Sequence, residues 1–104
     1  MIVVTFVPSY KIDREYIQTL FTADCITCAI QLLTAYLDIH PISDLLLYEI
    51  SHEHNSIQYQ IPSFHPKEKL GINLTHNEGT IYINRIKGIY ELDKLRKDFI
   101  DLFE

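Results

Sequence analysis

Residues 45–61 read LLLYEISHEHNSIQYQI, and this stretch decides the fold class. An apolar run at its start is typical of a β-strand, and so is the alternation of Ile57, Tyr59 and Ile61 with glutamines at its end. The polar residues 51–56 between the two runs predict a short connection. Because strands joined this closely pair antiparallel, we expect a β-hairpin here.

A second hairpin is predicted further along the chain. Residues 72–75 and 80–86 are its expected strands, and residues 76–79 connect them with a glycine where a turn needs a positive φ angle. Side-chain alternation then places Ile81 toward the core and Tyr82 on the opposite sheet face. A helix covering that face is one possibility. We favour an open face, on which Tyr82 contacts a partner protein.

A strand and a helix bound the two hairpins. Residues 2–7 are apolar and mostly β-branched, as in a strand that is buried on both faces. Leucine and phenylalanine recur at helical spacing over residues 92–103, which predicts a helix after Gly88. We expect an α+β fold in a single domain, residues 1–104. Its mostly antiparallel sheet has about five strands, and its helices pack on one face.

The region between the first strand and the first hairpin has a helical pattern. Apolar residues recur at helical spacing over residues 16–36, and Asp13 is a plausible N-cap. The two halves of this apolar stripe point in different directions, and a single straight helix would bury Asp24. We therefore favour a break near residues 22–24, although one continuous helix is the alternative.

Composition and charge limit the possible functions. The chain has 104 residues and a net charge of −5, and residues 1–65 carry two basic and seven acidic side chains. An acidic chain repels phosphate backbones, so we expect no nucleic-acid partner. The same field attracts a basic protein. No apolar run has the length of a membrane-spanning helix or a signal peptide, so we expect a cytoplasmic protein without membrane contact.

The segment Cys25-Ile26-Thr27-Cys28 is a C-x-x-C motif. In redox pairs of this spacing, the first thiol sits at a helix N-terminus just after a strand, where its pKa falls. Here the preceding sequence is helical in pattern, and both cysteines lie on the apolar stripe. We therefore interpret them as buried, reduced core residues without a metal. A redox or metal-binding role is the alternative.

Histidines form the other candidate site. His52-Glu53-His54 would place two imidazoles on one strand face, and His65 or His76 could add a third metal ligand. Because the triplet falls in the predicted turn, we interpret it as a solvated connection. We expect no cofactor. The sequence has no nucleophile elbow, P-loop or dinucleotide fingerprint, so we do not expect an enzyme. A small histidine-dependent enzyme or metal-binding protein is the alternative.

Tyrosine supports a binding function. The chain has seven tyrosines and no tryptophan, and tyrosine combines a large contact area with a polar tip that suits protein interfaces. We therefore expect a protein that works by binding another protein. The predicted partner-binding residues are Asp38, Asp44, Glu49, Glu53, Tyr48 and Tyr82.

The acidic stretches DREYIQTLFTAD (residues 13–24) and SDLLLYEISHEH (residues 43–54) contribute to a profile of small size, acidity and α+β pattern. This profile resembles the small cytoplasmic immunity proteins of bacterial contact-dependent inhibition and related polymorphic-toxin systems. The resemblance implies an inhibitor that covers the active site of a basic toxin domain, often a nuclease. Another phage or mobile-element inhibitor, or an antitoxin, would bind in the same manner and differ in its target.

Overall fold

A computed structural model describes residues 1–39, 46–51 and 56–103, and it describes side chains for residues 1–39 and 58–103. The chain forms an antiparallel sheet of five strands in the order β2-β1-β5-β4-β3. The strands are β1 (Ile2–Pro8), β2 (Gln18–Ala23), β3 (Leu46–Ser51), β4 (Ser56–Phe64) and β5 (Gly79–Arg85). The helices are η1 (Lys11–Tyr16), α1 (Ile26–Leu37), α3 (Pro66–Lys69), η2 (Ile89–Glu91) and α4 (Leu92–Asp101), of which η1 and η2 are 3₁₀-helices. The α+β fold class is therefore confirmed.

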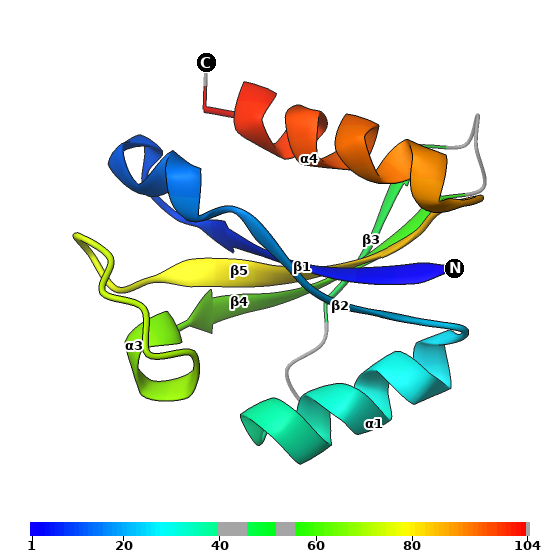
Figure 1. Ribbon diagram of the computed structural model, residues 1–104, viewed down its shortest axis with the longest axis horizontal. Helices are drawn as coiled ribbons and strands as arrows, with labels where there is room; N and C mark the ends of the chain where they lie inside the picture. The colour runs from blue at the N-terminus through cyan, green and yellow to red at the C-terminus, as the bar shows by residue number, and fades with distance from the viewer. Residues whose placement is uncertain (40–45, 52–55, 104) are drawn as a thin grey trace.

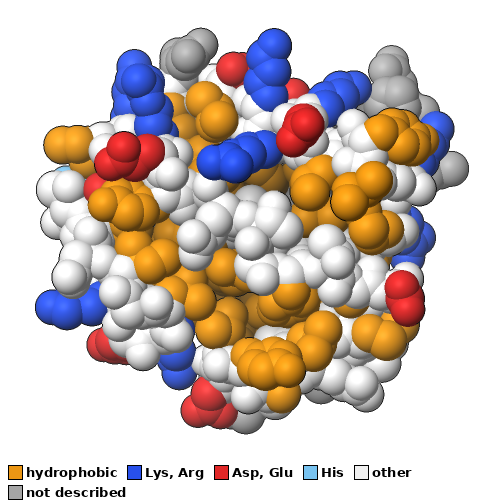
Figure 2. Space-filling model, viewed as in Figure 1, with side chains coloured by type: hydrophobic (Ala, Val, Ile, Leu, Met, Phe, Trp, Pro, Cys, Tyr) orange, Lys and Arg blue, Asp and Glu red, His pale blue; other side chains and the backbone are white. Residues whose placement is uncertain are grey.

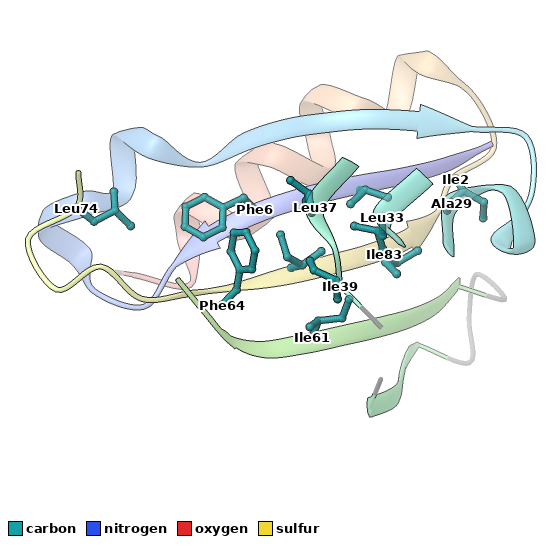
Figure 3. Packing of buried hydrophobic residues seen from close by; sticks show 12 residues of the cluster. Ile2, Phe6, Ala29, Leu33, Leu37, Ile39, Ile61, Phe64, Leu74 and Ile83 are labelled. Atoms are coloured by element: carbon teal, nitrogen blue, oxygen red, sulfur yellow. The ribbon is translucent and has the colours of Figure 1, made fainter. Parts of the chain in front are cut away.

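Helices cover both faces of the sheet. In Figure 1, α1 lies below the sheet and α4 lies above it. The larger core cluster joins Leu33 and Leu37 of α1 to apolar residues of β1, β4 and β5, including Phe6 and Ile83 (Figure 3). The second cluster joins Phe99 of α4 to the opposite face. The expectation of helices on one face was wrong, because the amphipathic α4 has its own apolar stripe to bury.

The second core cluster explains where α4 docks. Val7 of β1 and Ile17, just before β2, are buried against Phe99. Tyr82 and Leu95 pack around these three residues. The strand prediction for residues 2–7 is confirmed, and burial of all seven residues of β1 follows from its place between two apolar layers.

The predicted helix over residues 16–36 is correct only in its second half. A break does occur near residues 22–24, but the residues before it form η1 and β2. Asp13 does not cap a long helix; it is buried within η1. Four apolar residues in six positions (16, 17, 20 and 21) fit a helix, but a bulged strand also satisfies them. The register shift opposite Val4 and Thr5 lets Leu20 and Phe21 both pack against the larger core cluster.

The second predicted hairpin does not form. Residues 72–75 are not a strand, and β5 pairs instead with β1 and β4. Leu74 is nevertheless buried in the core. The backbone N–H and the hydroxyl of Thr75 donate to Asp13 Oδ1, each at 3.1 Å. The apolar alternation thus predicted the burial of Leu74 correctly. The backbone N–H of Thr75 donates to the buried Asp13 carboxylate instead of to a neighbouring strand.

The glycine expected in the turn has another role. Asn77 adopts the positive φ angle of 45°, whereas Gly79 begins β5. A Cβ atom on Gly79 would lie 2.3 Å from the ring of Phe6. Glycine is therefore needed at this position for the close approach of a core ring. The remaining expected elements are confirmed, namely the β3–β4 hairpin and the C-terminal helix α4.

Candidate functional site

Among the six predicted partner-binding residues, the structure describes the side chains of Asp38 and Tyr82. Asp38 is exposed at the C-terminal end of α1, where it adopts a left-handed conformation with φ 51° and ψ 36°. Tyr48 and Glu49 belong to β3, and the register places Tyr48 opposite Gln58, but their side chains lie outside the described residues. Asp44, Glu53, His52 and His54 also lie outside the described residues. The predicted acidic binding surface and the histidine site therefore remain predictions.

Tyr82 does not lie on an open face. Its side chain is half-buried, and its ring centroid lies 4.8 Å from that of Phe99 on α4, at an interplanar angle of 43°. The side chains of β5 do alternate as expected, since Ile81 and Ile83 face the α1 layer and Tyr82 faces away from it. The expectation of an open face was wrong, because α4 packs there. Tyr82 therefore belongs to the second core cluster.

An edge of the sheet is a better candidate for a binding surface. β2 is the last strand on one side of the sheet, and no described strand pairs with its outer side. Just before it, η1 exposes two large apolar side chains, Ile12 at 69% and Tyr16 at 38% of their full area. We call η1 and β2 together the edge surface. Unpaired strand edges and exposed apolar side chains both mark sites at which another chain can bind.

The charges of the edge surface lie on η1 and at the ends of β2. β2 itself contains no charged residue, Glu15 and Asp24 lie exposed on either side of it, and η1 also exposes Lys11 and Arg14. Natural proteins commonly protect free strand edges with lysine or proline, and β2 has neither. In Figure 2, hydrophobic side chains gather in the middle and lower part of the face where β2 and α1 lie, and most Lys and Arg side chains lie toward its upper part and rim.

The cysteines form a second site. Cys25 is exposed and Cys28 is half-buried, so the expectation that both are core residues was wrong. Cys25 is the N-cap of α1, with an extended backbone, and β2 ends only two residues earlier. The buried stripe of the helix begins one turn later, at Ala29. A residue at the N-cap lies outside the helical periodicity, so the stripe drawn from the sequence did not apply to Cys25.

The two thiols are close and chemically unequal. Their sulfur atoms lie 3.0 Å apart, and the Cys28 backbone N–H donates to Cys25 Sγ at 3.3 Å. The pKa of Cys25 is lowered, first because the Cys28 thiol can donate to its thiolate and next because the Cys28 N–H does so. The pKa of Cys28 is raised, first because its own S–H is held in that hydrogen bond. The Asp24 carboxylate raises both pKa values and so opposes the effect on Cys25.

Other classes of site find less support. Among the residues that the structure describes, no three His, Cys, Asp or Glu side chains gather as metal ligands. His65 and His76 lie in the loop region, where His65 Nδ1 lies 2.9 Å from the Asn77 carbonyl oxygen and His76 stacks against Tyr10. The described helices all fall short of the length and apolar character that crossing a bilayer requires. No protein-family model, characterised protein or solved structure matches the chain.

Proposed function

We propose that this chain is a protein-binding inhibitor that docks a basic partner along its edge surface. The observation that carries the proposal is the edge strand β2, whose outer side pairs with no strand among the described residues. β2 has no charged residue and follows two exposed apolar side chains. An extended segment of a partner can add to such an edge by main-chain hydrogen bonds, while the apolar side chains of η1 supply contact area. This mode of binding needs no catalytic residue on the inhibitor.

The net charge of −5 supports a basic partner. Glu15 and Asp24 lie beside β2 and would meet basic side chains that flank the docked segment. Opposite charges speed the encounter of two proteins more than they strengthen the final complex. In keeping with the resemblance to immunity proteins, the proposed partner is a bacterial toxin domain whose active site the chain covers, and the proposed location is the cytoplasm. Asp38, Asp44, Glu49 and Glu53 are proposed to contribute to the net negative charge, although Glu49 belongs to β3, at the opposite edge of the sheet from β2.

The experiment begins with the protein encoded by the adjoining gene and with proteins that the immobilised chain retains from its host. Each candidate is produced separately, and its toxic or catalytic activity is measured with and without this chain. The proposal expects stoichiometric inhibition and an association rate that falls as salt rises, because ions screen charges beyond about 8–10 Å. A retained protein whose activity is unchanged by saturating amounts of this chain contradicts the inhibitor proposal.

A matched pair of variants tests the docking surface. Thr22→Lys places a cation on the exposed side of β2, and Gln31→Lys adds the same charge on the exposed side of α1. Both change the net charge equally, so a difference between them reports position. Thr22→Lys is expected to weaken inhibition by about tenfold or more, as a change of roughly 1.4 kcal/mol in binding would do. Equal effects of the two variants would show that the partner docks elsewhere.

A further inference from the structure

The C-x-x-C motif lies in the setting that favours thiol reactivity. β2 ends at Ala23, Cys25 caps α1, and Cys28 is the third residue of that helix. A thiol at a helix N-terminus faces unpaired backbone N–H groups and the positive end of the helix dipole, both of which stabilise a thiolate. In the structure, the Cys28 backbone N–H donates such a hydrogen bond to Cys25 Sγ.

The two thiols also differ in access. Cys25 is exposed, so a disulfide in solution can reach its sulfur. Cys28 is half-buried behind it, with the sulfur atoms 3.0 Å apart. The buried residues Ala29, Leu33 and Leu37 anchor α1 against the sheet, and this packing holds the start of the helix in place. The pair therefore combines an accessible nucleophile with a nearby second thiol.

We propose that Cys25 and Cys28 form a redox-active dithiol that exchanges with disulfides, with Cys25 as the attacking thiol and Cys28 as the resolving thiol. The pKa directions agree with these roles, since the pKa of the exposed thiol is lowered and that of its neighbour is raised. Asp24 is the charged neighbour that opposes thiolate formation at both positions. This chemistry is independent of the proposed partner binding.

The exchange balances without any further reagent. The Cys25 thiolate attacks one sulfur of a disulfide R–S–S–R, a Cys25–S–S–R bond forms, and one R–S⁻ leaves and takes up a proton. Cys28 then gives its proton to solvent and attacks Cys25 Sγ. The Cys25–Cys28 bond forms, the bond to the second R–S breaks, and that thiolate is protonated. Two cysteine thiols are oxidised to one disulfide, and one disulfide is reduced to two thiols.

The test uses the full chain in buffers with different ratios of reduced to oxidised glutathione. After acid quenching and alkylation, intact mass is expected to show one reversible two-electron transition to an intramolecular disulfide. Since the chain has only two cysteines, the product is unambiguous. A wild-type chain that stays fully reduced in excess oxidised glutathione, or that oxidises only to dimers, would overturn the proposal. Retained zinc that protects both thiols from alkylation would also overturn it.

Two single variants assign the roles. Cys28→Ser leaves the attacking thiol without its resolving partner, so it is expected to accumulate a mixed disulfide with one glutathione. Cys25→Ser is expected to form that adduct at least about tenfold more slowly. Its remaining thiol, Cys28, has the raised pKa and is less accessible to solvent. Serine is a favoured N-cap, so Cys25→Ser preserves the start of α1, which circular dichroism verifies. Equal rates in the two variants would overturn the assignment.

Discussion

Tyr82→Ala tests whether α4 packs over the sheet face that carries Tyr82. The tyrosine ring is half-buried and lies 4.8 Å from the ring of Phe99, which is 4% exposed. Full burial of an aromatic side chain is worth about 3–5 kcal/mol on truncation to alanine, and half-burial reduces this to roughly 2–3 kcal/mol. For a domain of this size, the melting temperature is expected to fall by roughly 10–20 °C.

The assay is urea denaturation followed by circular dichroism, with Tyr36→Ala as the matched control. Tyr36 is 74% exposed, so its truncation is expected to change the free energy of unfolding by no more than about 0.5 kcal/mol. A double-mutant cycle of Tyr82→Ala with Phe99→Ala is expected to give a coupling of about 0.5–1.5 kcal/mol for the ring pair. If Tyr82→Ala costs no more than Tyr36→Ala and the coupling is zero, α4 does not pack where the structure places it.

Three further changes test separate contacts. Gly79→Ala is expected to lower the free energy of unfolding by about 2–3 kcal/mol, because the added Cβ would lie 2.3 Å from the Phe6 ring and 2.7 Å from a backbone oxygen; a cost near zero in urea denaturation would contradict this contact. Asp13→Ala is expected to lower the free energy of unfolding by about 2–3 kcal/mol in the same assay, because both hydrogen bonds from Thr75 are lost. If Thr75→Val lowers the free energy of unfolding as much in the Asp13→Ala background as it does in the wild type, the two residues act separately and the prediction is contradicted. Cys28→Ala removes the side-chain donor that lowers the pKa of Cys25. The pH at which iodoacetamide alkylation of Cys25 reaches half its maximum rate is therefore expected to rise, and a fall in that pH would contradict the hydrogen-bond explanation.

The sequence predicted strands best where the apolar pattern allowed only one element. β1 is too uniformly apolar for a surface helix, and the glutamines of β4 alternate with apolar residues, so both were identified. Residues 16–21 were ambiguous, because a short apolar pattern with a bulge satisfies helical spacing as well. The pairing of these residues with β1 decides between the two structures, and a contact between segments that are separated in the sequence is not visible in local periodicity.

The incorrect helix prediction for the residues of β2 led to the incorrect prediction that Cys25 and Cys28 are core residues. When residues before Cys25 are treated as helical, the motif falls in the middle of a helix and its thiols point into the core. Once they form a strand, Cys25 becomes the N-cap and its thiol is exposed. The same holds for Tyr82: its orientation followed from alternation, but the position of α4 depends on tertiary packing. The alternation along β5 thus predicted the direction of the Tyr82 side chain, whereas the packing of α4 over it could not be derived from the sequence of the strand alone.

The position of β5 in the sheet has a consequence for how the chain folds. β1–β2 and β3–β4 are pairs of neighbouring segments, but β5, which follows these four strands in the sequence, pairs with both β1 and β4 at the centre. On the ribosome, the two pairs emerge before the strand that joins them, so β1 and β4 keep unpaired inner edges until residues 79–85 have left the tunnel. Contacts of such long sequence separation slow folding, and open strand edges promote aggregation in the meantime. Production in cells is therefore expected to depend strongly on translation rate and temperature.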